Sequence, residues 1–273
     1  DHAVFSVPAT ASFVVSITFP RLAPEEIEQA IPYEAQKYVP IPLSEVVLDW
    51  ELLDGGEERD TLEVMLVAVP REHEDKFTRI AERASLTPDA LEVETFSMAR
   101  SLIGRDQTPS ALINIGWRTT TLGLIDRGIL RLSRNFSRGS NDLTAALERG
   151  MGIAAERAEA IKREIGLTER IEEKDIVSIL TPLIDSLFAE IARVIEFYNR
   201  RSARSIQKII LTGGGSRLPG LIEAAAAHFG IEVASGNPFA RIVTPAFLEP
   251  ALRQIGPSFA VASGLALRQI TNK

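Results

Sequence analysis

The residues NIGWRTTT, from Asn114 to Thr121, are the stretch on which the interpretation of this chain depends most. They lie between two β-rich runs and therefore predict a strand–turn–strand hairpin with a glycine and hydroxyl side chains at its tip. Backbone amides at such a tip can surround a phosphate, and a side chain at position 114 can reach a metal-bound water. Taken alone, an ordinary hairpin with β-favouring threonines explains the same pattern.

A second glycine-rich turn, TGGGS from Thr212 to Ser216, stands far along the chain between a predicted strand and a predicted helix. Glycines there let backbone N–H groups approach a ligand, and a helix N-terminus favours anions. Two standard nucleotide fingerprints fail at this turn. Leu218 occupies the sixth position of the dinucleotide pattern, and Leu221 stands where a phosphate loop requires lysine. A tight β-to-α turn is the simpler interpretation of the glycines by themselves.

Hydrophobic periodicity around these motifs predicts an α/β fold in which strands and helices alternate. Strands are expected at 12–20, 46–53, 61–69, 111–115, 121–125, 129–136, 206–211 and 231–234. Helices are expected at 24–38, 71–86, 141–149, 154–165, 173–201, 218–229, 247–254 and 258–270. Pro182 is expected to bend the longest helix or to reset its start.

Composition excludes several classes of protein. The chain has 273 residues, 37 of them acidic and 30 basic, for a net charge of −7, and it has no cysteine. The length suggests about two domains. Without cysteine there is no disulfide scaffold or thiolate metal site. The acidic balance argues against non-specific nucleic-acid binding, and no apolar run approaches the ~18 to 20 residues that direct membrane insertion requires. The three histidines have no spacing that indicates a metal site or a charge relay.

The motifs together, in their order, resemble those of actin-like ATPases. They are NIGWRTTTL, GSNDLTAAL, AEAIK, LTGGGSRLPGL, NPFARI and GPSFAVASGLALR, and the last three resemble the PilM family of type IV pilus assembly in particular. The stretch PEEIEQAIPYEAQKYVPIPLSEVVLDW is similar to a small subdomain that this family shares with the division protein FtsA. The resemblance implies an actin-like ATPase (RNase H-like) fold with a small inserted β-α-β-β-α subdomain.

The same resemblance implies a division of the chain. The inserted subdomain is expected at 12–88, and the second actin-like lobe at 111–254 with a helical subdomain at about 139–172. Residues 1–11, 89–110 and 255–273 are then expected to belong to the first lobe. The family's first phosphate loop lies upstream of the region that matches FSVPATASF. We therefore expect this chain to be N-terminally incomplete, or a reduced form, with half of the phosphate clamp and weak ATP binding.

ATP with Mg²⁺ is the cofactor that the resemblance implies. The expected nucleotide-binding residues are those matching the second phosphate motif, the ribose- and adenine-facing helix and the adenosine motif: Asn114, Gly116, Thr119, Thr120, Glu159, Lys162, Gly213, Gly214, Gly215 and Ser216. By spacing alone, Glu159 and Lys162 are typical of a surface ion pair on one helix face. The family motif usually begins with aspartate, and the neutral Asn114 is a poorer partner for Mg²⁺, so hydrolysis is expected to be slow or absent.

The resemblance therefore implies a scaffold more than an enzyme, with no catalytic or metal-ligating residue expected. It implies a cytoplasmic protein, peripheral to the inner membrane, that binds the N-terminal peptide of a PilN-like partner while ATP acts as a conformational ligand. Self-association is left open. The alternatives are the actin-like cytoplasmic domain of a type II secretion protein without ATPase activity, an FtsA-like filament protein and an actin-fold kinase.

The partner site is expected at the apolar run that follows the first predicted helix. Its residues are Tyr38, Pro40, Ile41, Pro42 and Leu43. Two prolines remove backbone donors and stiffen the run, so it can offer an apolar wall without inviting strand aggregation. A rigid loop that ends the preceding helix explains the same residues equally well.

Overall fold

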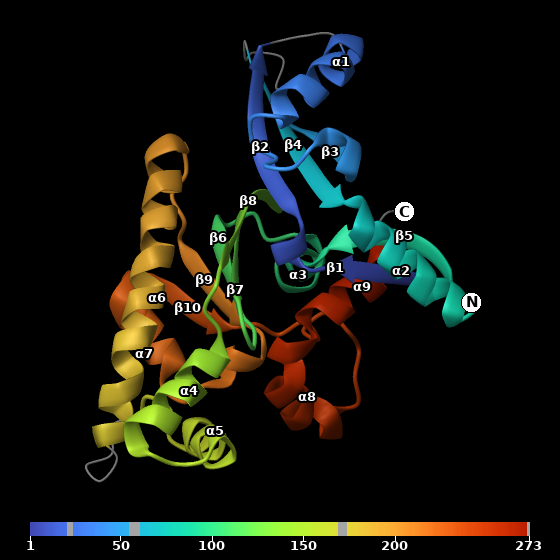
Figure 1. Ribbon diagram of the computed structural model, residues 1–273. Coiled ribbons are helices and arrows are strands. Elements are labelled where there is room, and N and C mark those ends of the chain that lie inside the picture. The colour runs from blue at the N-terminus through green and yellow to red at the C-terminus, as the bar shows by residue number, and fades with distance from the viewer. Residues whose placement is uncertain (21–23, 55–60, 169–173, 272–273) are drawn as a thin grey trace.

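A five-stranded mixed sheet forms the centre of the computed structural model, which describes residues 1–20, 24–54, 61–168 and 174–271 (Figure 1). The strand order is β10-β9-β6-β7-β8, with β6 parallel to β9 and antiparallel to β7. The strands span Ser110–Ile115 (β6), Thr120–Asp126 (β7), Ile129–Phe136 (β8), Lys208–Thr212 (β9) and Glu232–Ser235 (β10).

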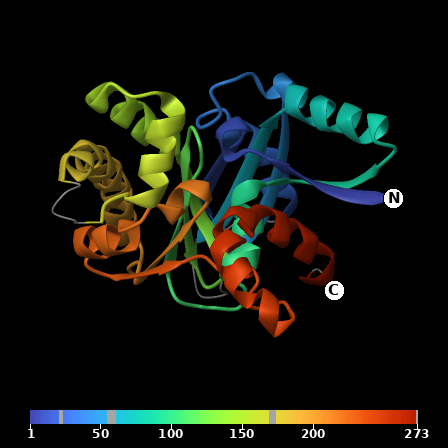
Figure 2. The ribbon, with the colours of Figure 1, turned by 90° about the horizontal axis from the view of Figure 1, so that it is seen from below.

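Helices cover both faces of this sheet (Figure 2). Ile113 of β6 packs into the core that contains α6, whereas the next residue back, Leu112, packs into the core that contains α3 and α9. Because successive strand side chains point to opposite faces, a sheet buried on both sides needs continuous apolar strands. The helices on the first face are α4 (Ser140–Met151), α5 (Ala155–Glu164), α6 (Lys174–Arg201) and α7 (Leu221–Phe229). Helix α6 runs through Pro182, so this proline does not reset its start.

A second, two-stranded sheet lies beside the other face. Its parallel strands β1 (His2–Val7) and β5 (Thr87–Val93) contact α2 (Arg71–Arg83), α3 (Glu94–Leu102) and α9 (Ala260–Thr271). The helix α8 (Glu249–Ile255) precedes α9, with the short 3₁₀ turn η6 (Gly256–Phe259) between them. The strands β1 and β5 and the helix α3 are not among the elements that periodicity predicts. Among the described residues, no helix is long and apolar enough to cross a bilayer.

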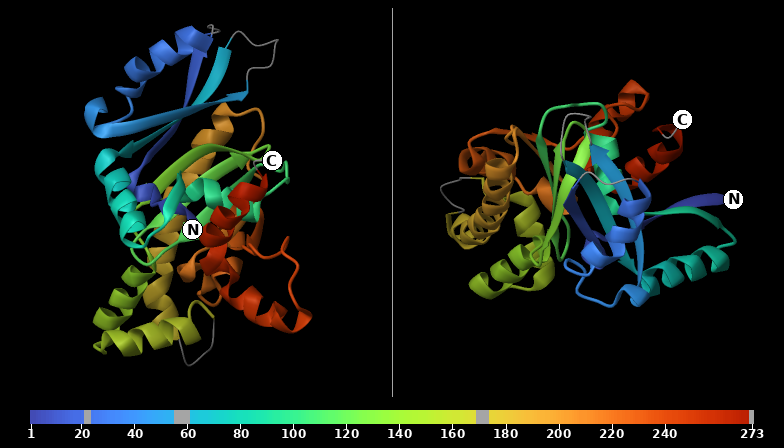
Figure 3. Two further views of the ribbon diagram at one scale, coloured as in Figure 1. Left: turned by 90° about the vertical axis from the view of Figure 1, so that its right-hand side faces the viewer. Right: turned by 90° about the horizontal axis from the view of Figure 1, so that it is seen from above.

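A three-stranded antiparallel module stands at one end of the molecule (Figure 3). Its order is β2-β4-β3, with strands at Phe13–Pro20 (β2), Val46–Asp54 (β3) and Thr61–Pro70 (β4). Helix α1 (Pro24–Ala35) packs on one face through Ile27 and Ile31. An ion pair of 2.8 Å between Glu63 of β4 and Arg131 of β8 joins the module to the central sheet. The domain boundaries expected from the resemblance stay predictions.

Two clefts as candidate functional sites

The two sequence motifs that lie far apart in the chain meet at the ends of β6 and β9. Gly213 has a left-handed backbone (φ +85°), and a Cβ atom there would come within 2.3 Å of Oδ1 of Asn114. A Cβ atom on Gly215 would come within 2.5 Å of Cγ2 of Ile115. Only glycine permits this approach. Glycine at these two positions therefore allows the turn to lie directly against the hairpin.

Backbone hydrogen bonds fix the hairpin tip to the start of α4. The N–H of Gly116 donates to the carbonyl of Thr119 at 2.9 Å, which closes the tip. The N–H groups of Ser140 and Asn141 donate to the carbonyls of Gly116 and Trp117, at 2.9 and 2.8 Å. The first N–H groups of a helix have no acceptor within the helix. Here the carbonyl groups of the hairpin act as the acceptors. Hairpin and helix consequently form one rigid corner.

Two of the predicted nucleotide-binding hydroxyls are used within the protein. The buried Thr120 donates to the carbonyl of Arg138 at 2.8 Å, and the buried Ser216 donates to the carbonyl of Gly213 at 2.8 Å. Both bonds hold a loop in shape. In this structure neither hydroxyl donates toward the cleft described next.

The predicted pair of Glu159 and Lys162 lies on α5, where Lys162 is buried and Glu159 is partly buried. The Lys162 side chain donates to the carbonyl of Ser140 (3.0 Å), to Oγ1 of Thr144 (2.8 Å) and to Oε2 of Glu159 (2.6 Å). An ammonium group has three N–H bonds, so all of them are occupied. The other carboxylate oxygen, Oε1, accepts a 2.6 Å bond from Arg163. The cluster thereby ties α5 to the first turn of α4.

Opposing effects set the pKa values of this pair. Burial lowers the pKa of Lys162, and the neighbouring carboxylate of Glu159 offsets part of that shift. Burial by itself would raise the pKa of Glu159. The hydrogen bonds from Lys162, Thr144 and Arg163 outweigh it and hold the pKa of Glu159 below its usual range. The carboxylate is therefore ionised at neutral pH.

A cleft of about 290 Å³, the smaller cleft, opens beside this cluster. Four sequence-predicted residues line it: Glu159, Lys162, Gly214 and Gly215. Trp117 and Arg217 also line it, and sequence reasoning missed both although they stand inside the quoted motifs. Arg217 is exposed and makes no ion pair with the described residues. The N–H groups of Gly214 and Gly215, at the start of the 3₁₀ turn η4 (Gly214–Arg217), donate to no acceptor in the described part of the chain, so together with Arg217 they allow the cleft to hold an anion.

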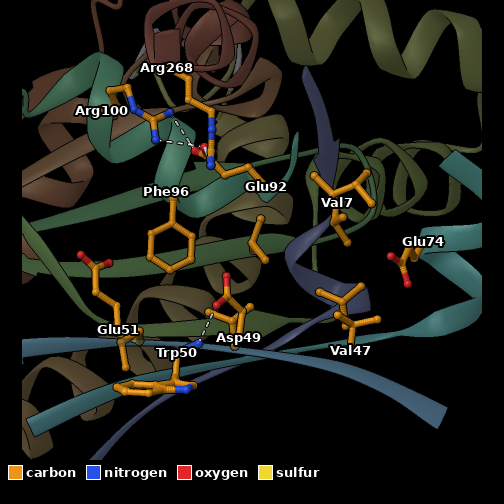
Figure 4. Close-up of a pocket in the computed structure, with 15 residues that line it drawn as sticks. Val7, Val47, Asp49, Trp50, Glu51, Glu74, Glu92, Phe96, Arg100 and Arg268 are labelled. Atoms are coloured by element: carbon orange, nitrogen blue, oxygen red, sulfur yellow. Dashed lines mark hydrogen bonds and ion pairs between the residues drawn. The ribbon is translucent and has the colours of Figure 1, made fainter. Parts of the chain in front are cut away.

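The larger cleft, of about 540 Å³, lies between the three-stranded module and the β1–β5 sheet (Figure 4). Cross-strand pairs of β3 and β4 on the face away from α1 form one wall: Val47 with Val69, Asp49 with Val67 and Glu51 with Met65. The facing wall carries Val7 of β1, Leu91 and Val93 of β5, and Phe96 of α3. The cleft thus has apolar walls contributed by separate parts of the chain.

An ionic network closes one end of the larger cleft (Figure 4). Glu92, whose side chain is 4% exposed, accepts two bonds from Arg100 (2.8 and 2.9 Å), one from Ser97 (2.8 Å) and one from Arg268. Burial tends to raise the pKa of Glu92, but these donors hold it below its usual range. The network joins β5, α3 and α9. Sequence reasoning assigned no role to any of its members, although Arg268 is the last residue of the quoted motif GPSFAVASGLALR.

Acidic side chains mark the remainder of the larger cleft. Asp49, Glu51 and Glu74 line it and make no ion pair with any described residue. The two arginines in the cleft are already bound to Glu92. The cleft therefore carries unbalanced negative charge, which favours a cationic ligand.

The run predicted to bind a partner lies at the edge of the module, outside the larger cleft. Ile41 is half-buried and lines a separate hollow of about 530 Å³, together with Phe13. Leu43 packs against the core of the module, while Tyr38, Pro40 and Pro42 are exposed. The structure thus gives the run a packing role as well as an exposed surface, and its partner role stays a prediction.

One further carboxylate, which is partly buried, lies at the start of α3. Oε1 of Glu94 accepts bonds from the N–H of Ala9 (3.2 Å) and from the hydroxyl of Thr121 (3.4 Å). Burial raises the pKa of Glu94. No group of three or more histidine or acidic side chains in the described part of the chain could hold a metal ion.

Comparisons with known proteins agree on the fold. A solved structure of a PilM–PilN type IV pilus biogenesis complex superposes with a TM-score of 0.83 at 28% identity, covering 98% of this chain and 80% of that one. MreB5 of Spiroplasma citri bound to AMPPNP superposes with a TM-score of 0.56 at 14% identity, over 75% of this chain and 66% of that one, which shows an actin-like fold.

Sequence comparisons give the family. The cell division protein FtsA of Rhizobium meliloti is 28% identical over 210 residues, which are 68% of this chain and 46% of FtsA. The chain thus spans about half the length of the curated relatives it matches. The family model described as type IV pilus assembly protein PilM matches residues 1–270. The chain therefore belongs to the PilM family of type IV pilus assembly proteins.

Proposed function

We propose that the chain is a scaffold of type IV pilus assembly that binds an extended peptide from an inner-membrane partner in its larger cleft. The observation that carries this proposal is the cleft itself, with apolar walls from β1, β3, β4, β5 and α3. A PilM relative at 28% identity was solved as a complex with PilN, which supports a PilN-like partner. Attachment through such a partner would keep the protein on the cytoplasmic side of the inner membrane.

The walls suit an extended peptide with alternating side chains. Val47, Val67 and Val69 line the cleft from the three-stranded module, and Phe96 of α3 lines the facing wall. Extended peptides bind beside a sheet when alternate side chains enter such pockets. The uncompensated charges of Asp49 and Glu51 would attract a basic residue of the peptide, so its affinity should fall as salt rises.

The smaller cleft is the place we assign to ATP as a conformational ligand. The N–H groups of Gly214 and Gly215 and the guanidinium of Arg217 would hold phosphate oxygens. Asn114 lies against Gly213 and outside the lining of this cleft, and it is the residue that the resemblance assigns to Mg²⁺ or its water; its amide oxygen would be a weaker ligand than a carboxylate. Bound Mg²⁺ would neutralise phosphate charge. The chain's own residues bind and orient the nucleotide, and we expect at most slow hydrolysis.

Calorimetric titration with the N-terminal peptide of the PilN-like partner tests the proposal. Val47→Glu puts a carboxylate into an apolar wall beside Asp49 and should weaken binding by about 2–3 kcal/mol if the peptide buries this position. Unchanged affinity in a variant that melts like the wild type would contradict the placement.

Ile41→Glu is the matched variant, because it introduces the same charge at the run predicted from sequence. Loss of binding in Ile41→Glu with full binding in Val47→Glu would place the peptide in the 530 Å³ hollow. Among the alternatives, an FtsA-like filament protein is supported only by similarity over about half of FtsA. A filament would show as large assemblies in light scattering at micromolar protein.

A further inference from the structure

Trp117 is a large aromatic side chain that the fold holds outside its core. It stands at the tip of the hairpin between β6 and β7, and 51% of it is exposed. The backbone at Trp117 is held in place, because its carbonyl accepts the 2.8 Å bond from the N–H of Asn141 at the start of α4. An exposed indole on a rigid support, at the wall of a cleft, is typical of a binding residue and not of core packing.

The indole of Trp117 is also held in position by a buried cation. The ammonium of Lys162 lies over the Trp117 ring, 5.6 Å from its centroid, and only 4% of Lys162 is exposed. Because the three N–H groups of Lys162 are held by Ser140, Thr144 and Glu159, the cation cannot move away freely. A cation over one face of an indole is an attractive contact. It sets the ring's position while the exposed half stays available to a ligand.

The three hydrogen bonds that occupy Lys162 also limit what the cleft can recognise. Lys162 has no N–H group left to donate to the edge of a bound base. Two groups of this cleft that make no hydrogen bond or ion pair with the described part of the chain, Arg217 and the first N–H groups of η4, are suited to phosphate. A flat aromatic ring, by contrast, can stack on any base because every base has a π-face.

We propose that Trp117 is a specificity-determining residue of the smaller cleft, whose indole stacks on the base of a bound nucleoside triphosphate. Lys162 and Glu159 are positioning residues that act through Trp117. This inference rests on the proposed nucleotide binding. It adds that the cleft selects for a flat ring without reading the base edges, so ATP and GTP should bind within a few-fold of each other.

The test compares ATP, GTP and inorganic tripolyphosphate by calorimetry on the full-length protein. Trp117→Ala should weaken ATP and GTP about tenfold and leave tripolyphosphate unchanged, because only the nucleotides carry a base. Trp117→Phe should restore most of the affinity. Phe197→Ala, which removes a comparably exposed aromatic ring from α6 outside the cleft, is the matched control and should bind like the wild type. Tryptophan emission excited at 295 nm should respond to ATP in the wild type and lose that response in Trp117→Phe.

Equal loss of ATP and tripolyphosphate affinity in Trp117→Ala would mean that Trp117 only supports the fold, and would overturn the inference. Unchanged ATP affinity would overturn it too, as would tighter ATP binding, which would mean that the indole obstructs the cleft. A wild type that binds neither ATP nor tripolyphosphate would overturn the nucleotide part of the proposed function with it. The peptide titration in the larger cleft would still stand as a separate result.

Discussion

Replacing Glu92 by glutamine should destabilise the fold markedly, because this carboxylate joins β5, α3 and α9 at the closed end of the larger cleft. Its side chain is 4% exposed and accepts charge-assisted bonds from two arginines. Such bonds contribute ~1.5–3 kcal/mol each. Arg100 and Arg268 are 18% and 31% exposed, so water can take over part of their solvation in the variant. We therefore expect a loss of about 3 kcal/mol at pH 7, measured by urea unfolding.

The stabilisation by Glu92 should depend on pH, and the shift in the pKa of Glu92 sets the direction of that dependence. The donors lower the pKa of Glu92 in the folded state below its ordinary value of 4.5. The stabilisation is therefore complete above that value and is lost as pH falls through the lower, folded-state pKa. Glu249→Gln removes a surface ion pair whose partners are 59% and 74% exposed, and it should cost under about 0.5 kcal/mol. A Glu92→Gln variant as stable as the wild type at pH 7 would refute this explanation. A difference in the free energy of unfolding between wild type and variant that stays constant below pH 4 would refute it too.

Three further predictions concern the core and the cofactor. Glu94→Gln should raise the free energy of unfolding at pH 7 and lose that advantage on acidification, because burial raises the pKa of Glu94 and the charged form is therefore costly above pH 4.5. Gly264→Ala should lower the melting temperature strongly, since its Cβ would come within 1.8 Å of the Ser97 carbonyl oxygen, whereas Gly150→Ala meets only the flexible end of Ile179 and should be nearly neutral. ATP hydrolysis, followed by phosphate release, should stay well below about 1 per second, and Asn114→Asp should make ATP binding more dependent on Mg²⁺. Kinase-like turnover or an Asn114→Asp variant indifferent to Mg²⁺ would contradict the last of these.

The central sheet was predictable because its strands carry an unambiguous signal. Ala111 to Ile113 and Ile209 to Leu211 are apolar without interruption, as burial on both faces requires. The strand β5 was not predictable in the same way. It contains Pro88 and Asp89, which disfavour strands, and it is stabilised by parallel pairing with β1. The helix α3 begins with Glu94-Thr95-Phe96-Ser97, where buried hydroxyl and aromatic residues replace strong helix formers.

The residues of the candidate sites were predictable from sequence only where they belong to a motif of the family. The glycine turn and the hairpin could be paired through the family resemblance, and the structure brings Gly213 against Asn114. The larger cleft could not be found this way. Its lining comes from seven separate elements, and residues such as Val47 and Phe96 look like ordinary core positions in sequence. Only the packing of the module against the β1–β5 sheet reveals that they face an open space.

Hydrogen–deuterium exchange with and without the PilN-like peptide would locate the bound peptide without any substitution. If the peptide lies in the larger cleft, amide exchange should slow in β3 (Val46–Asp54) and β5 (Thr87–Val93), the strands that line this cleft, and should change little at residues 38–43. Protection confined to residues 38–43, with β3 and β5 unchanged under saturating peptide, would contradict this placement.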